Sequence, residues 1–493
     1  MTESIKTKAI RGILWNAIDK FAAQGVQFII GIILARLLMP KDFGLIGMLS
    51  IFIALSQSFI DSGMGSGLIQ KQNRSDVDFS TVFVFNLCVS LFFYGILFIT
   101  APLIAKFYNL PQLVNLTRVL SLNIIINSLA IVQRSKLIIN IDFKTFAKVN
   151  VVSVLTGGII AVFFAYAGFG VWALVIQNLI SATVSVLMLW LLSKWKPSLS
   201  FSKESFKDLF GFGSKLLISG LYARTLNEIY NLVIGKTYSA SDLGYYTRSK
   251  QIAEVSAGTV NSIMQQVTYP ILASLQNDKE QLISVFNRLI KMTAFFIFPA
   301  MTLLALLADP FIRFFLTNKW EPAIILLQWL CFAKVFTPIC SINMNILNAI
   351  GRSDLFLKVD LSKAPLIIIV LVITVPMGLK AIVIGNVITS GIAFFINAYM
   401  PGKLFGYGAI KQLKDMIPVF FATGLMAVSV YVSISFTESL ILKLILGSLV
   451  GIIIYGIISH FLKIEGTKEI KNVLKSLLQK TEKNHVNRKK DGN

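Results

Sequence analysis

About fourteen apolar segments, each of roughly transmembrane length, constrain this chain more than any other feature. A transmembrane helix needs about 20 predominantly apolar residues, and hydropathy alone locates such segments. The segments that begin near residues 13, 208 and 243 are the weakest because polar residues interrupt them. The pattern predicts an all-α integral membrane protein, with helices near 13–36, 44–69, 80–105, 113–137, 149–167, 170–192, 208–235, 243–272, 288–307, 321–350, 361–377, 380–400, 412–434 and 439–462.

The composition agrees with a membrane protein. Hydrophobic residues make up 55% of the 493 residues and charged residues 14%, whereas a soluble domain averages about 25% charged residues. The chain carries 46 Lys and Arg against 24 Asp and Glu. In a soluble protein this excess would suggest a nucleic-acid partner. Here the basic residues separate apolar segments, so the positive-inside rule explains them and we expect no nucleic acid.

Basic residues gather in alternate loops, about thirty-one on one side of the membrane against about eight on the other. The basic side includes both ends of the chain, so we expect both termini in the cytoplasm, in agreement with an even number of helices. The start of the sequence shows no small-residue cleavage site, so no cleaved signal peptide is evident.

The cysteine and histidine content argues against several kinds of chemistry. Three cysteines, at positions 88, 331 and 340, lie in apolar segments at unrelated spacings, and the chain has two histidines. This content is typical of buried thiols and not of a disulfide framework or a metal site. The chain also carries no P-loop pattern for nucleotide hydrolysis. We therefore expect no catalytic residues, no metal and no cofactor.

A sequence junction recurs after 200 positions. The stretch "ILARLLMPKDFG" (33–44) and the stretch "VIGKTYSASDLG" (233–244) share the order basic residue, five residues, Asp, one residue, Gly. We expect Arg36 and Lys236 to lie at the outer surface, and Asp42 and Asp242 to cap the helices that follow. The repeat predicts two six-helix lobes that face a central cavity, related by an axis along the membrane normal. The expected divisions are 1–200, 201–402, two additional helices in 403–462, and a basic amphipathic cytoplasmic tail in 463–493.

Ionisable residues inside predicted helices mark the candidate site, because such residues are costly in a bilayer. They concentrate in the first two helices of each lobe, at spacings that give each helix one polar face. The cationic groups suit a phosphate or diphosphate. Candidate substrate-binding residues are Arg224, Lys250, Arg248, Lys20, Gln24 and Asn227, and candidate ion-coupling or charge-balancing residues are Glu228, Glu254, Asp19 and Asp61.

Two purely structural interpretations of these polar residues are also open. Arg224 with Glu228 and Lys250 with Glu254 have i, i+4 spacing, so intrahelical pairing could be their whole role. The asparagine run that begins at Asn343 lacks charge, and we expect it to form hydrogen bonds between helices.

Several stretches carry a resemblance to a known family. They are "GILWNAIDKFAAQGVQFIIGIILARLLMPKDFGLIGM" near the start, "GLIQKQN", "APLIAKFYN", "ALVIQNLI" and "DLGYYTRSKQIAE". With them the chain resembles, over about residues 5–460, the bacterial polysaccharide flippases (O-antigen or teichuronic-acid type) of the multidrug/oligosaccharidyl-lipid/polysaccharide exporter superfamily. The resemblance implies a flippase that moves a polyprenyl-diphosphate-linked oligosaccharide from the cytoplasmic to the outer leaflet by alternating access, for surface polysaccharide biosynthesis.

The same resemblance implies a multi-pass protein of the bacterial inner membrane, a monomeric transport unit, and the polysaccharide polymerase machinery as a candidate partner. One alternative is an ion-coupled multidrug antiporter of the same superfamily, against which the excess of Lys and Arg on the polar faces argues. A second alternative is an integral-membrane polysaccharide polymerase or ligase. It would need a sizeable surface loop, and the longest outer connection spans only about residues 307–322.

Overall fold

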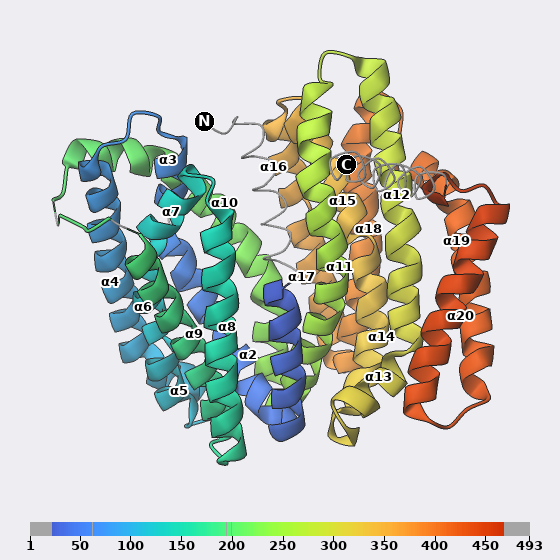
Figure 1. Cartoon of the computed structure of the whole chain (residues 1–493), viewed down its shortest axis with the longest axis horizontal. Helices are drawn as coiled ribbons and strands as arrows, with labels where there is room; N and C mark the ends of the chain where they lie inside the picture. The colour runs from blue at the N-terminus through green and yellow to red at the C-terminus, as the bar shows by residue number, and fades with distance from the viewer. Residues whose placement is uncertain (1–21, 62, 194, 199, 468–493) are drawn as a thin grey trace, which may run out of the picture. The chain divides into compact units, whose positions relative to one another are not determined.

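The computed structural model describes residues 22–61, 63–193, 195–198 and 200–467, and within these ranges every predicted apolar segment is helical (Figure 1). In the part of the chain that the structure describes, ten helical stretches are long and apolar enough to cross a membrane. Two further helices of 35 residues each, α10 (Lys203–Thr237) and α11 (Ala240–Ser274), are more polar, and they correspond to predicted segments that polar residues interrupt. The prediction of an all-α, multi-pass membrane protein is confirmed. The expected amphipathic tail lies outside the described residues from position 468 onward.

The chain divides into two compact units, Met1–Thr247 and Arg248–Asn493. The first unit extends beyond the predicted lobe boundary at residue 200 because α10 packs against α2, α3 and α4. The division into two six-helix lobes, which rests on the sequence repeat, stays a prediction. The first unit contains the helix 22–37, α2 (Pro40–Asp61), α3 (Met64–Gln70), α4 (Asp76–Tyr108), α5 (Leu113–Leu120), α6 (Leu122–Ser128), α7 (Ile131–Ile139), α8 (Phe143–Tyr166), α9 (Val171–Leu192), α10 and the start of α11.

One predicted segment is interrupted where the backbone leaves the right-handed helical region. The segment 44–69 splits into α2 and α3 because Gly63 adopts a left-handed conformation with φ of 67°. A residue with a Cβ would pay a steric cost there, which glycine avoids. Helix starts follow local capping chemistry. Ser75 and Asp78 form a capping box at α4, and the Ser202 side chain accepts a hydrogen bond from the backbone at the start of α10.

The repeated junction caps α2 and α11 in the same way. Asp42 Oδ2 accepts a hydrogen bond from the Met39 backbone nitrogen at 2.9 Å, and Asp242 Oδ2 accepts one from the Ser239 backbone nitrogen at 3.2 Å. The predicted capping roles of both aspartates are confirmed. Lys236 is exposed, and its Nζ donates to the Phe107 carbonyl and lies 4.6 Å from the centre of the Phe107 ring.

The two junctions also cross each other at a reciprocal contact. A Cβ on Gly44 would lie 1.6 Å from the carbonyl oxygen of Ala240, and a Cβ on Gly244 would lie 1.9 Å from the carbonyl oxygen of Pro40. Positions 40 and 240 correspond in the repeat, as do 44 and 244. Gly44 thus meets position 240 while Gly244 meets position 40. A two-fold relation between two segments produces this kind of reciprocal contact.

The second unit contains the rest of α11, α12 (Lys279–Leu306), α13 (Ala308–Phe315), η1 (Asn318–Trp320), α14 (Pro322–Val335), α15 (Thr337–Ala349), α16 (Ser353–Leu361), α17 (Lys363–Thr374), η2 (Val375–Met377), α18 (Leu379–Phe405), α19 (Ala409–Ser435) and α20 (Leu440–Phe461). The last two lie side by side and both pack against α12 (Figure 1). Tyr455 Oη of α20 donates to the Phe295 carbonyl of α12 at 2.7 Å.

A buried pair of amides joins α15 to α19. Asn343 Nδ2 donates to Gln412 Oε1 at 3.0 Å, and Gln412 Nε2 donates back to Asn343 Oδ1 at 2.7 Å. Each amide therefore satisfies a donor and an acceptor of the other in a place without access to solvent. The prediction of interhelical hydrogen bonding by Asn343 is confirmed.

Candidate functional site

An ion pair joins the polar faces of α10 and α2. Arg224 Nη2 lies 3.4 Å from Asp61 Oδ2, and Gln57 Nε2 donates to the other carboxylate oxygen of Asp61 at 2.9 Å. The Arg224 and Asp61 side chains are 45% and 48% exposed. Accessible ion pairs contribute only about 0–1 kcal/mol to stability. The contact therefore holds both charges in place weakly, and either charge is open to another partner.

The same two helices share a second polar cluster around Glu228. Ser50 Oγ of α2 donates to Glu228 Oε2 at 2.5 Å, and Asn231 Nδ2, one turn further along α10, donates to the same oxygen at 2.7 Å. Asn231 Nδ2 also lies 3.2 Å from Ser50 Oγ. The Glu228 carboxylate is thus held by neutral donors, whereas the Arg224 guanidinium pairs with Asp61. Within the described part of the chain, the interpretation that Arg224 and Glu228 serve only to pair with each other is wrong.

The second unit contains an interhelical ion pair of its own. Lys334 Nζ, near the end of α14, lies 2.8 Å from Glu254 Oε1 of α11. Since Glu254 has this partner on another helix, pairing with Lys250 is not the whole role of Glu254. Lys250 is half-buried, and Arg248 is 5% exposed and donates from Nη1 to Gln251 Oε1 at 2.5 Å.

The structure describes two of the four remaining candidate site residues. Gln24 and Asn227 are both exposed. Lys20 and Asp19 lie outside the described residues. The structure therefore brings Arg224 to Asp61, holds Glu228 in a separate cluster between α2 and α10, and places Glu254 with a lysine that is not among the candidate site residues.

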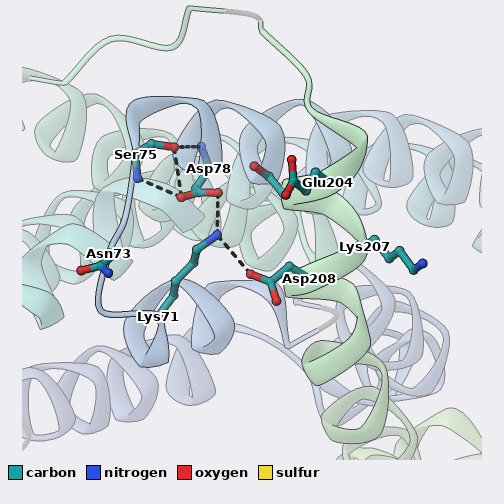
Figure 2. Close-up of a pocket in the computed structure, with 8 residues that line it drawn as sticks. Lys71, Asn73, Ser75, Asp78, Glu204, Lys207 and Asp208 are labelled. Atoms are coloured by element: carbon teal, nitrogen blue, oxygen red, sulfur yellow. Dashed lines mark hydrogen bonds and ion pairs between the residues drawn. The ribbon is translucent and has the colours of Figure 1, made fainter.

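A polar cavity of about 750 Å³ lies where α3 ends and where α4 and α10 begin. Lys71 Nζ lies 3.1 Å from Asp78 Oδ1 and 3.1 Å from Asp208 Oδ2. Figure 2 shows Lys71 reaching between the two carboxylates, while Lys207 points away from them. The hydrogen bond to Asp208 raises the pKa of Lys71 above its usual value. The lining residues are Lys71, Asn73, Ser75, Asp78, Glu204, Ser205, Lys207 and Asp208.

The ion pairs of Lys71 with Asp78 and Asp208 in this cavity hold the first turns of α10 against α3 and α4. Below the ion pairs, Leu209 packs in a core cluster with Phe79 and Val82, and Phe206 and Phe210 border it. Sequence reasoning missed the pairing, because the positive-inside rule already accounts for a lysine in this loop. The signal that could have revealed it is the Ser75-x-x-Asp78 capping pattern, which fixes an acid near Lys71.

Residues 33–325, which are more than half of the chain, match the family described as "Polysaccharide biosynthesis protein". The chain is 27% identical over 357 residues to the teichuronic acid biosynthesis protein TuaB of Bacillus subtilis, covering 71% of this chain and 73% of TuaB. It is 27% identical over 354 residues to the succinoglycan biosynthesis transport protein ExoT of Rhizobium meliloti, covering 71% and 72%. It is 25% identical over 372 residues to the lipopolysaccharide biosynthesis protein WzxC of Escherichia coli, covering 75% and 76%.

Solved structures show the same fold. The lipid II flippase MurJ in an inward closed conformation matches with a TM-score of 0.75 at 17% sequence identity, covering 91% of this chain and 98% of MurJ. A multidrug resistance MATE family transporter in its inward-facing conformation matches with a TM-score of 0.61 at 19% identity, covering 80% of this chain and all of the transporter.

Proposed function

We propose that this chain, which belongs to the polysaccharide biosynthesis protein family, is a flippase that moves a lipid-linked oligosaccharide across the membrane for surface polysaccharide biosynthesis. The cargo is a polyprenyl-diphosphate-linked oligosaccharide, and it travels from the cytoplasmic to the outer leaflet by alternating access. The names of TuaB, ExoT and WzxC support the pathway, and the fold shared with the lipid II flippase MurJ supports the transport of a lipid-linked sugar.

The observation that carries the proposal is the accessible pair of Arg224 and Asp61. A guanidinium binds phosphate oxygens through two parallel hydrogen bonds, each charge-assisted. Hydrogen bonds to charged groups contribute about 1.5–3 kcal/mol each, whereas an exposed ion pair contributes about 0–1 kcal/mol. A diphosphate can therefore displace Asp61 from Arg224. In the empty site, Asp61 balances the charge of the guanidinium.

Glu228 is the candidate for coupling transport to an ion gradient. Its carboxylate accepts from Ser50 and Asn231, which are neutral, so it can take up a cation without first losing a basic partner. The chain has no P-loop pattern, and an ion gradient or the membrane potential supplies the energy in this proposal. In this proposal the chain spans the inner membrane of a bacterial cell and both termini lie in the cytoplasm. One chain is the transport unit, and it has no enzymatic activity.

A drug antiporter is the second candidate function, because the MATE transporter shares the fold. In that case the accessible carboxylates of Asp61 and Glu228 would bind cationic drugs or ions, and Arg224 would be dispensable. The two functions therefore differ in which member of the pair at 3.4 Å is essential.

Complementation tests the proposal in cells. A strain that lacks its own flippase, and therefore its surface polysaccharide, receives the wild-type chain or a variant. We expect Arg224→Gln to abolish surface polymer at normal abundance in the membrane, and Arg352→Gln to leave it normal. Arg352 is the matched control because it is an exposed arginine that also pairs with an aspartate, Asp354. Normal polymer with Arg224→Gln, together with drug resistance that needs Asp61, would favour the antiporter.

A further inference from the structure

An apolar groove of about 490 Å³ opens on the surface between α2, α4 and α10. Stacked aromatic rings form its walls. The rings of Phe59 and Phe93 stack with their centres 4.7 Å apart, and the rings of Phe85 and Phe210 meet edge to face at 5.9 Å. The lining residues are Phe59, Phe85, Cys88, Val89, Phe92, Phe93, Phe210 and Leu217.

Arg224 is not part of the lining, and it lies further along α10 than the lining residues Phe210 and Leu217. Phe210, Leu217 and Arg224 follow one another at intervals of seven residues, which places them in one stripe along the helix. Each interval spans about 10 Å, at a rise of about 1.5 Å per residue. On α2, Phe59 precedes Asp61 by two residues, so the apolar lining ends at the level of the ion pair. An apolar chain in the groove would therefore have its end beside a cation.

Burial alone does not choose an occupant for this groove. Lipid tails are as apolar as its side chains, so moving a chain from the bilayer into the groove gains little from the hydrophobic effect. The selective features are the aromatic packing and the charge at its end. A neutral lipid has no charged group to pair with Arg224. A phospholipid carries two chains beside its phosphate, and a single groove holds only one. A diphosphate joined to one long chain matches a single groove that ends at a guanidinium.

We propose that the groove between α2, α4 and α10 holds the polyprenyl chain of the cargo while the diphosphate binds Arg224. This rests on the proposed function and extends it, since it assigns the lipid part of the cargo to named residues. Phe210 and Leu217 precede Arg224 on a helix whose start lies at the cytoplasmic side by the charge pattern of the loops. The bound cargo would thus have its chain on the cytoplasmic side of the guanidinium.

Photo-crosslinking tests the assignment. The full chain is reconstituted in phosphatidylcholine vesicles with a polyprenyl diphosphate that carries a photoreactive group on its chain, and the adducts are located by mass spectrometry. We expect adducts in residues 85–93 and 210–217. Excess unlabelled polyprenyl diphosphate should remove them, whereas equal amounts of polyprenol or phosphatidylglycerol should not. Removal by phosphatidylglycerol to the same extent would show a general lipid surface and overturn the proposal.

A pair of variants separates the groove from the transport function. Val89→Trp fills the groove and should weaken binding of the probe by about tenfold, which corresponds to about 1.4 kcal/mol. Ile99→Trp, on the same helix and 75% exposed, is the control and should bind as the wild type does. Normal binding and normal surface polymer with Val89→Trp, alongside loss of polymer with Arg224→Gln, would refute the groove and leave the flippase function standing. Normal polymer with Arg224→Gln would refute the function itself.

Discussion

Gly44 and Gly244 lie against each other's helices with almost no room for a side chain. A Cβ on Gly44 would stand 3.1 Å from the backbone nitrogen of Gly244, and a Cβ on Gly244 would stand 3.3 Å from that of Gly44. The repeat therefore does more than mark two helix ends. It provides the two small residues that let α2 and α11 approach closely at their first turns, as small residues do in membrane helix packing.

Substitution of either glycine by leucine should force these helix starts apart. Overpacking of this kind costs about 1–3 kcal/mol. We expect lower membrane abundance and a lower midpoint of thermal unfolding for Gly44→Leu and for Gly244→Leu. Gly95→Leu is the control, because a Cβ on Gly95 of α4 meets nothing within 4 Å. Equal midpoints for all three variants would mean that the crossing is not tightly packed.

An exchange of the two charges distinguishes substrate binding from structural pairing. In the double variant Arg224→Asp with Asp61→Arg, an ion pair can still join α10 and α2, since the two groups are 3.4 Å apart in the wild type. Stability should change by less than about 1 kcal/mol, as for other accessible pairs. Transport should nevertheless fall sharply, because the guanidinium has moved to another helix. Restored transport in the double variant would assign the pair a purely structural role.

Glu228→Gln should separate ion coupling from folding. Glutamine keeps the shape of the side chain and an oxygen that accepts from Ser50 Oγ and Asn231 Nδ2. We expect little loss of stability and loss of the dependence of transport on an imposed proton or sodium gradient. Gradient-driven uptake in proteoliposomes measures this, with Glu228→Asp as the conservative variant that retains a carboxylate. An unchanged response to both gradients would remove Glu228 from the coupling mechanism.

The amide pair of Asn343 and Gln412 predicts a non-additive effect on stability. Asn343→Leu removes the donor to the buried Gln412 Oε1, which costs about 1–3 kcal/mol, although Gln412 Nε2 keeps its bond to the Tyr407 carbonyl. Replacing both residues by leucine removes the need for a partner and should recover most of that loss. Thermal unfolding of Asn343→Leu, of Gln412→Leu and of the double leucine variant gives the coupling energy. Additive losses would show that the two amides act independently.

The Lys71 anchor should resist alkaline pH. The hydrogen bond to Asp208 raises the pKa of Lys71 above its usual 10.5. A group whose pKa is raised on folding stabilises the protein fully below its unfolded value and loses that contribution as pH rises through the folded value. The difference in unfolding midpoint between wild type and Lys71→Gln should therefore stay constant from neutral pH to about pH 10, and shrink above it. A difference that disappears near neutral pH would contradict this assignment.

Hydropathy predicted most of the helices, because burial in a bilayer leaves a long apolar run few options besides a helix. The repeated junction predicted the caps at Asp42 and Asp242, which depend on neighbours in sequence. The partners of Arg224 and Glu254 could not be predicted. At i, i+4 spacing an intrahelical partner is always available, and the choice of Asp61 and Lys334 depends on how neighbouring helices are rotated.

We propose that the chain flips a polyprenyl-diphosphate-linked oligosaccharide and that Arg224 binds the diphosphate. Proteoliposomes with a fluorescent lipid-linked oligosaccharide in both leaflets test it directly, since a membrane-impermeant quencher reaches only the outer leaflet. Transport adds quenching of the inner pool. We predict that the fluorescence of both pools is quenched in vesicles with the wild-type chain or the control Arg352→Gln. In vesicles with Arg224→Gln only the outer pool should be quenched, as in protein-free vesicles. Equal quenching of the inner pool with Arg224→Gln and with wild type would contradict this proposal. So would an inner pool that stays unquenched with wild type under an imposed ion gradient and membrane potential.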